Sequence, residues 1–319
     1  MKAAVYRRYG PPDVLRIEDV PTPDAGPHEL LVRVRATTVS AGDSRLRSAR
    51  VPRGFGLLMR VGFGITGPRK PILGWDFAGE VAAVGSSVSR FVVGQRVFGT
   101  RMGSHAEYVA VPETSLATIP GNLSFEAATA LVFGGMTSLF YLRDKAQMQA
   151  GERVLINGAS GAVGSSAVQL ATHFGGVVTA VCSAGNAELV RSLGAARAIA
   201  YNKEDFTHTG ETYDIVLDAV GNCTFTRCER ALAPGGRLLL VVASLGQIIG
   251  ATLRPSRAGR KVLTGVNATR TEDLVLLGTL AESGALRPVI DRTYPLARIA
   301  DAHAHVDTGH KKGSVVITL

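Results

Sequence analysis

The sequence predicts an α/β protein with two domains, a barrel-like β domain and a doubly wound parallel sheet of six strands. Residues 1–120 contain many short β-branched runs between Gly and Pro turns, which is typical of a barrel. From residue 125 to residue 266, β-like and α-like segments alternate strictly, as in a parallel sheet covered by helices. A glycine-rich turn at residues 158–164 joins the first strand of the sheet to its first helix. A chain of 319 residues is long enough for both domains.

The β-rich region is expected to form strands where apolar and β-branched residues run or alternate. These strands are predicted at residues 2–6, 15–20, 29–38, 81–84, 96–98 and 106–111. Pro112, Pro120 and Gly121 then break the pattern, so we place the end of this region at residue 124.

The alternating region opens with two predicted helices, at residues 125–133 and 136–143. Strands are predicted at 153–157, 177–182, 196–200, 213–218, 237–242 and 261–266, and helices at 162–174, 187–193 and 225–232. Asn186 is expected to cap the helix at 187–193, and Gly194 to end it. Helices at 271–283, ended by Gly284, and at 296–306, and a last strand at 314–319, are expected to return to the first domain. The predicted boundaries are therefore residues 1–124, 125–266 and 267–319.

The glycine-rich turn follows an apolar strand and opens a helix on small residues. Residues 159–164 match the dinucleotide-binding fingerprint, with Ala159 in the position of its first glycine. A pyrophosphate must approach backbone N–H groups at a helix N-terminus, so side chains there have to be absent or very small. The turn therefore predicts a dinucleotide cofactor. Its expected contacts are Asn157, Gly158, Ser160, Gly161, Ala162, Val163 and Gly164.

The end of the second predicted strand indicates which dinucleotide is bound. Enzymes that use NAD usually carry an acidic residue there, which holds the ribose 2′-hydroxyl. Residues 153–187 contain no Asp or Glu, so nothing acidic would repel a 2′-phosphate, and NADP(H) is favoured. The residues expected near that phosphate are Cys182, Ser183, Asn186, Arg191 and Tyr201. An exposed helix side chain and an ordinary strand-end aromatic remain the alternatives for Arg191 and Tyr201.

Composition excludes several other classes of function. The net charge is +9, but no nucleic-acid-binding motif accompanies it, so we expect no specific nucleic-acid partner. The three cysteines, Cys182, Cys223 and Cys228, form no CxxC pair, which argues against a disulfide framework or a thiolate zinc site. The first ten residues lead into no apolar segment, and the longest apolar runs are short and interrupted by glycine. We therefore expect a cytoplasmic protein without a signal peptide or transmembrane segment.

Several motifs along the whole chain resemble one known family. They include residues 1–15 (MKAAVYRRYGPPDVL), 39–43 (VSAGD), 74–81 (GWDFAGEV), 94–99 (GQRVFG), 157–164 and 310–313 (HKKG). Together they resemble the medium-chain dehydrogenase/reductases, and most closely their zinc-independent quinone oxidoreductase and enone reductase branch. The resemblance implies a GroES-like catalytic domain beside a Rossmann domain, with the active site in the cleft between them. By analogy it also implies a homodimer.

The residues in the family's zinc-ligand positions argue against a metal. Zinc-bearing relatives carry a Cys where this chain has residues 40–43, and a Gly-His-Glu where it has Gly74-Trp75-Asp76. Trp75 cannot bind Zn²⁺, and the cluster around His303 and His305 has no acidic or thiol companions at metal-binding spacing. Alcohol oxidation without zinc lacks its Lewis acid, whereas reduction of a polarised C=C bond or a quinone needs less.

The resemblance also assigns residues to the active site. Thr137 matches a position near the nicotinamide, and Ser40 and Asp43 match a polar pair at the substrate cleft. A hydroxyl that caps a helix and an ordinary polar turn are the alternatives. Residues at strand ends that are expected to contact cofactor are Val220, Ala243, Ser244 and Asn267. No proton donor is evident, since Tyr108 is interpreted as structural and His105 remains a candidate.

Residues 45–70 form an unusual segment, with seven basic residues, no acidic residue and two interleaved apolar runs. One hypothesis is a mobile apolar lid over the substrate cleft that admits a large or anionic substrate or touches a membrane surface. The other is a helical surface insertion that packs its apolar face against its own domain.

Three functions remain open from the sequence. The first is an NADPH-dependent, zinc-independent reductase of quinones or α,β-unsaturated carbonyls. The second is an NADP-dependent alcohol or carbonyl dehydrogenase. The third is an NADPH-binding regulatory or RNA-binding protein with little turnover.

Overall fold

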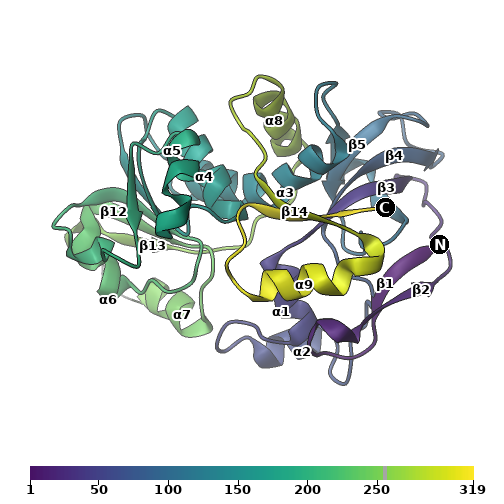
Figure 1. Ribbon diagram of the computed structural model, residues 1–319, viewed down its shortest axis with the longest axis horizontal. Coiled ribbons are helices and arrows are strands. Elements are labelled where there is room, and N and C mark those ends of the chain that lie inside the picture. The colour runs from purple at the N-terminus through teal and green to yellow at the C-terminus, as the bar shows by residue number, and fades with distance from the viewer. Residues whose placement is uncertain (254–256) are drawn as a thin grey trace.

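Two lobes lie side by side in the structure, a computed structural model that describes residues 1–253 and 257–319 (Figure 1). The lobe that carries both termini is rich in β strands, and the other lobe contains the parallel sheet and its helices. This is the mixed α/β architecture that the sequence predicts.

The β-rich lobe is built on a seven-stranded sheet in the order β14-β15-β3-β4-β5-β7, with β6 also paired to β3. Its strands are β3 (Glu29–Val39), β4 (Asp76–Val84), β5 (Arg96–Thr100), β6 (Tyr108–Pro112), β7 (Leu116–Thr118), β14 (Ile290–Pro295) and β15 (Ser314–Thr318). A separate antiparallel pair consists of β1 (Lys2–Tyr6) and β2 (Leu15–Asp19). Because β15 pairs antiparallel with β3, the C-terminal segment completes the N-terminal sheet.

Two strands and two helices in this lobe are not among those predicted. Strand β14 is mostly exposed and gives no alternating apolar signal, and β7 has three residues. Helices α1 (Ala41–Ser48) and α2 (Gly56–Phe63) lie in the segment for which a lid and a surface insertion were alternatives.

The second lobe contains the predicted six-stranded parallel sheet, and its strand order is β10-β9-β8-β11-β12-β13. They are β8 (Arg153–Asn157), β9 (Val177–Cys182), β10 (Arg197–Ala200), β11 (Tyr213–Asp218), β12 (Leu232–Leu240) and β13 (Lys261–Leu263). The associated helices are α4 (Ala162–His173), α5 (Ala187–Ser192), α6 (Phe225–Cys228) and α7 (Leu245–Leu253). Strands β9 and β10 are added on one side of β8, and the chain then crosses over to add β11, β12 and β13 on the other side. Ligands of open parallel sheets bind at such a switch point, beside the carboxyl ends of the strands.

Helix α3 (Phe125–Leu139) continues through a π-helical turn to Lys145 and forms one helix where the sequence predicts two. Its central glycines permit close packing. A Cβ at Gly134 would lie 2.2 Å from the Ala162 carbonyl oxygen, and one at Gly135 would lie 2.6 Å from Leu277 of α8 (Thr271–Glu282). Among the described residues this helix alone has the length and apolarity of a membrane span, but 72% of that apolar window is buried. It is therefore a core helix that contacts both lobes.

The predicted helix ends are partly correct. Gly194 and Gly284 follow α5 and α8 with φ of +109° and +77°, a left-handed conformation that suits glycine. Asn186 occupies the N-cap position of α5, as predicted, but its side chain makes no capping hydrogen bond. Its Nδ2 instead donates to Ser160 Oγ at 2.9 Å. The last helix, α9 (Ile299–Asp307), packs against α1 and β15.

Candidate active site

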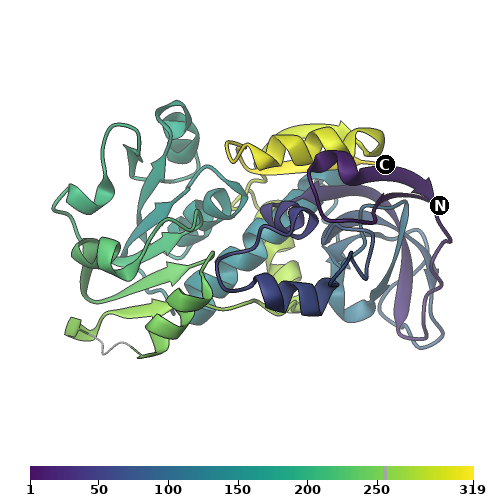
Figure 2. The same cartoon turned by 90° about the horizontal axis from the view of Figure 1, so that it is seen from below.

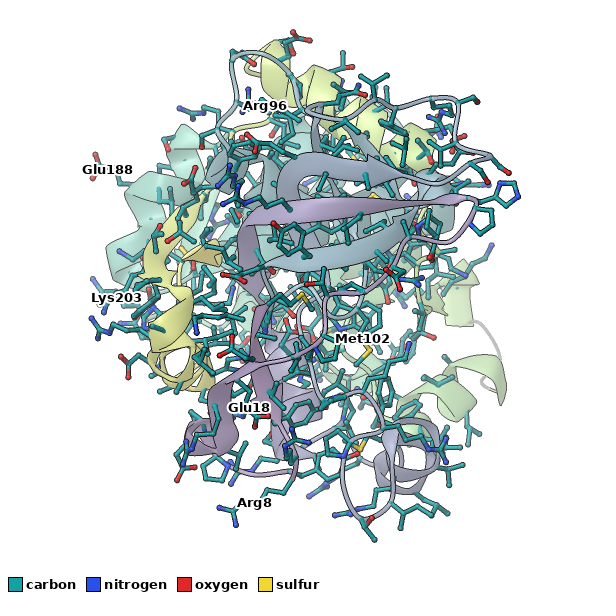
Figure 3. The ribbon with its side chains drawn as sticks, turned by 90° about the vertical axis from the view of Figure 1, so that its right-hand side faces the viewer. Arg8, Glu18, Arg96, Met102, Glu188 and Lys203 are labelled. Carbon is teal, nitrogen blue, oxygen red and sulfur yellow. The ribbon has the colours of Figure 1, made fainter. Side chains whose placement is uncertain are left out.

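A cavity of about 490 Å³ lies where the two lobes meet. The β-rich lobe contributes polar and apolar side chains, α3 contributes a mostly apolar face, and the segment after β13 closes the third side. Among the described residues, those that line the cavity include Ser40, Lys70, Trp75, Asp76, Met102, Val132, Phe133, Met136, Thr137, Val266 and Asn267. Met102 is labelled in Figure 3, below the strands of the seven-stranded sheet.

Ser40 is held at the cavity by a reciprocal cap at the start of α1. Its Oγ donates to Asp43 Oδ2 at 2.6 Å, and its backbone N–H donates to the same oxygen at 2.8 Å. The Asp43 backbone N–H returns a bond to Ser40 Oγ at 3.2 Å. The second oxygen of Asp43 accepts the Gly74 backbone N–H at 3.0 Å. Asp43 is completely buried and does not line the cavity, so it positions Ser40 and the Gly74 turn.

Asp76 is a carboxyl group at the cavity that the sequence analysis did not single out. Its side chain is 3% exposed, and Oδ2 accepts a hydrogen bond from Thr38 Oγ1 at 2.8 Å. Burial, with a contribution from the nearby Asp43 carboxylate, raises the pKa of Asp76 to about 7, although the Thr38 bond opposes this rise. The motif Gly74-Trp75-Asp76 places this carboxyl next to Trp75 in the sequence, but the burial that raises its pKa arises only in the folded chain.

Thr137 lines the cavity from the last turn of α3 and is 8% exposed. Phe133 and Met136 lie on the same lining face. Because the helix begins twelve residues earlier, at Phe125, Thr137 does not cap a helix start. Asn267 approaches from the segment after β13, so Ser40, Thr137 and Asn267 surround one space.

The glycine-rich turn has the geometry that a pyrophosphate requires. Gly158 has φ of +82°, and a Cβ at Gly164 would lie 2.1 Å from the Gly158 carbonyl oxygen. Gly161 precedes the first turn of α4 in an extended conformation. Ala162 and Val163 begin that helix, and Ser160 accepts the Gly313 backbone N–H at 2.8 Å through its carbonyl oxygen. The turn therefore presents backbone without bulky side chains at a helix N-terminus.

Asn157 fixes the neighbouring strand ends. Its Nδ2 donates to Asp218 Oδ1 at 2.9 Å and to Asn222 Oδ1 at 2.7 Å. Asp218 also accepts backbone N–H groups of the loop that carries Val220. Val220 leans over the turn, because a Cβ at Gly158 would lie 2.6 Å from Val220 Cγ2. Asn157 thus fixes the strand ends beside the glycine-rich turn.

The predicted 2′-phosphate residues gather at the end of β9. Burial raises the pKa of the Cys182 thiol, and the nearby Arg191 guanidinium opposes the shift. The Tyr201 backbone N–H donates to the Cys182 carbonyl at 3.0 Å, and its side chain is 57% exposed. Ser183 precedes the turn that carries Asn186, whose amide reaches Ser160 of the glycine turn.

Ser244 and Ala243 follow β12. The Ser244 Oγ donates to Gln247 Oε1 at 3.0 Å and accepts the Gln247 backbone N–H at 3.2 Å. This hydroxyl is engaged at the start of α7, and Ala243 beside it is half-buried. Both residues follow the carboxyl end of a central strand, as their prediction requires.

The histidines are distributed away from the cavity. His105 is completely buried, its Nε2 lies 2.9 Å from the Thr38 carbonyl oxygen, and burial lowers its pKa. It does not line the cavity. His303 is buried beside it, with a ring separation of 5.8 Å, and His305 pairs with Asp291 at 2.5 Å. No group of three or more His, Cys, Asp or Glu side chains in residues 1–253 and 257–319 is placed to hold a metal ion.

A parallel nucleotide-binding sheet joined to a GroES-like β domain, with a cavity between them, defines a nicotinamide-dependent oxidoreductase. The chain matches the alcohol dehydrogenase GroES-like domain over residues 26–121 and the zinc-binding dehydrogenase domain over residues 193–317. It belongs to the medium-chain dehydrogenase/reductase superfamily.

Three similar proteins describe its place in that superfamily. The 2-methylene-furan-3-one reductase of Solanum lycopersicum is 33% identical over 99% of this chain and 79% of its own length. The chloroplastic NADPH-dependent alkenal/one oxidoreductase of Arabidopsis thaliana is 32% identical with the same coverage. The structure of the quinone oxidoreductase from Coxiella burnetii superposes with a TM-score of 0.89 at 30% identity, covering 100% of this chain and 99% of that one.

Proposed function

We propose that this protein is a zinc-independent, NADPH-dependent reductase of α,β-unsaturated carbonyls or quinones. The observation that carries the proposal is the composition of the cavity. None of its described lining residues is Cys or His, Trp75 occupies the position of a zinc ligand, and the Asp76 carboxyl lies in the wall. Such a site lacks the ligands for a catalytic zinc and offers a proton donor instead.

The proposed cofactor is NADP(H), which supplies a hydride when bound. The glycine turn and the N-terminus of α4 would hold its pyrophosphate, with Val220, Ala243, Ser244 and Asn267 along the groove. Cys182, Ser183, Asn186, Arg191 and Tyr201 surround the expected 2′-phosphate position. No acidic side chain stands at the end of β9 to repel that phosphate. The Arabidopsis relative is named for NADPH, which supports this choice.

The chain's own groups complete the reduction. The Thr137 hydroxyl and the Asn267 amide can donate hydrogen bonds to a substrate carbonyl oxygen in the cavity, whereas Ser40, whose hydroxyl proton is donated to Asp43, forms part of the polar wall beside them. The apolar surface of Trp75 and Phe133 excludes water around the reacting carbon. Asp76, when protonated, can supply the proton that must accompany the hydride.

Asp43 has an indirect role in this scheme. Its hydrogen bonds orient Ser40, so we include Asp43 as a positioning residue for the Ser40 wall of the substrate cavity. We further propose a cytoplasmic enzyme, because Cys182, Cys223 and Cys228 are all buried free thiols. A homodimer follows from the family resemblance.

The direct test is NADPH oxidation against a panel of quinones, enones, aldehydes and saturated ketones, each with and without a chelator. We expect turnover of quinones or enones that the chelator leaves unchanged. Turnover confined to aldehydes, or lost with the chelator, would instead assign the protein to the alcohol and carbonyl dehydrogenases. NADPH binding without any turnover would favour a regulatory role.

A further inference from the structure

Helix α2 is apolar on both of its sides, but only one side is packed against the protein. Met59 is buried, and Phe55 and Phe63, one turn before and after it, are half-buried on the same side. The opposite side exposes Leu57, Leu58 and Val61 by 76%, 57% and 54%, and Ile65 beyond the helix end by 64%. We call these four residues the α2 face. A helix that is apolar all round is normally covered on every side, so this face lacks its partner.

The segment that carries the α2 face is ordered. Tyr9 Oη donates to the Gly64 carbonyl at 2.8 Å, and Arg60 Nη1 donates to the Ile65 carbonyl at 2.7 Å while stacking over the Tyr9 ring. On the other side, the Leu245 backbone N–H donates to the Arg53 carbonyl at 3.0 Å and links the segment to the second lobe. The α2 face is therefore preformed, and its four residues do not line the cavity.

Exposed basic side chains flank the α2 face along the chain, and we call them the basic rim. Residues 45–70 contain no acidic residue, and five of their basic side chains are exposed: Arg50, Arg53, Arg60, Arg69 and Lys70. Arg8 points outward at the same lower edge of the molecule (Figure 3). Glu18, an acidic residue on neighbouring β2, is paired with Arg7 at 2.5 Å. Figure 2 shows α2 on the side turned toward the viewer, with α7, whose Ile249 is 50% exposed, on that same side.

We propose that the α2 face binds the surface of an anionic lipid bilayer, with the aliphatic side chains at the acyl boundary and the basic rim among the headgroups. Exposed aliphatic groups flanked by cations match this environment in both polarity and charge. A second copy of the chain is disfavoured, because a twofold contact would set five cations against the same five. Lys70 belongs to both the rim and the cavity lining, so a bound bilayer would lie beside the cavity mouth.

Vesicle flotation of the full-length protein tests this proposal without any substrate. We expect the protein to float with phosphatidylcholine vesicles that contain about 30% phosphatidylglycerol, but weakly with phosphatidylcholine alone. Binding should fall steeply when the salt is raised to about 0.5 M. The double variant Leu57→Ser/Leu58→Ser should lose at least about tenfold in affinity. The matched control is Val92→Ser/Val93→Ser, which alters two valines with 68% and 62% exposure outside this segment and should bind normally.

Thermal melting and NADPH binding of each variant show that the fold is kept, whatever the enzyme's substrate. Equal flotation of Leu57→Ser/Leu58→Ser and the native protein would overturn the proposal, as would no flotation at all. Sedimentation analysis without lipid shows whether a second copy of the chain binds the α2 face. A dimer that Leu57→Ser/Leu58→Ser converts to a monomer would assign the α2 face to a second copy instead.

Discussion

Asp76 and Trp75 are adjacent residues with different consequences for the chemistry. The indole of Trp75 cannot bind a metal ion and adds apolar surface to the cavity wall, and Asp76 places an ionisable group in the same wall. The carboxyl is useful as an acid because its burial raises its pKa to about 7. At an ordinary pKa near 4, roughly one side chain in a thousand would be protonated at neutral pH.

The pH dependence of the reaction should report this carboxyl. A general acid acts in its protonated form, so kcat/KM should decline as pH rises through about 7. Asp76→Asn should lower kcat/KM by roughly 10²-fold or more and remove this decline. Stopped-flow NADPH oxidation across pH 5–9 (assay settings of about this range) measures both effects.

The variant Thr38→Val is a control for the assignment of the pH-dependent decline to Asp76. The Thr38 hydroxyl stabilises the ionised carboxylate, so its loss should move the decline to higher pH while the enzyme stays active. A decline that persists unchanged in Asp76→Asn would show that another group titrates.

A substitution at Gly164 tests whether the glycine-rich turn binds the dinucleotide, because it adds a single methyl group to that turn. A methyl group there would meet the Gly158 carbonyl oxygen at 2.1 Å, so the turn would have to move. We expect Gly164→Ala to weaken NADPH binding by at least about tenfold and to lower the melting temperature. Gly121→Ala is the matched control, because its Cβ would meet nothing within 4 Å. Calorimetric NADPH titration of both variants measures the difference, and equal affinities would contradict the proposed groove.

The start of helix α1 contributes both to the stability of the fold and to the orientation of Ser40 at the cavity. Asp43 holds the helix start and the Gly74 backbone together from a fully buried position. Asp43→Ala should therefore lower the free energy of unfolding by about 2 kcal/mol. It should also raise the substrate KM, because Ser40 loses its orientation.

Denaturant unfolding of Asp43→Ala should be compared with that of Asp19→Ala. Asp19 is an exposed carboxylate in a long surface ion pair with Lys2, so its loss should cost less than about 1 kcal/mol. If the two variants unfold alike, Asp43 does not hold the element as described.

Elements with a regular apolar pattern were predictable from the sequence, and those without one were not. Strands β8, β9 and β11 have their predicted bounds because they are buried apolar runs. Helix α3 was divided at Gly134 and Gly135 because these glycines reflect contacts with α4 and α8, which are distant in sequence. Strand β14 has too little burial to leave a pattern.

Only the part of the site that a local sequence pattern encodes was predictable. The glycine turn is local in sequence, whereas the cavity gathers Ser40, Asp76, Thr137 and Asn267 from segments far apart in the chain. The pKa of Asp76 depends on burial by those segments. No short motif encodes that property.

At the scale of the whole molecule, the account requires catalysis without a bound metal. Extended dialysis against a chelator should leave the rate of NADPH-dependent reduction and the melting temperature unchanged, because none of the described residues that line the cavity carries a thiol or an imidazole. Metal analysis of the dialysed protein verifies the removal. Loss of activity that returns with Zn²⁺ would contradict this expectation.

The arrangement of the two lobes determines where the hydride can go. The glycine turn and the cavity between the lobes place the proposed cofactor beside Ser40, Thr137 and Asp76. With an enone as the substrate, the hydride and the proton add to the two carbons of the C=C bond while the proposed groups hold the carbonyl oxygen, so the carbonyl itself should survive the reaction.

The destination of the hydride is the most direct test of this account. The enzyme would be supplied with NADPH deuterated at C4 of the nicotinamide and a simple enone, and the product analysed by NMR. We predict deuterium at the β carbon of a saturated carbonyl product. Deuterium on the carbinol carbon of an allylic alcohol would contradict the account and identify a carbonyl reductase.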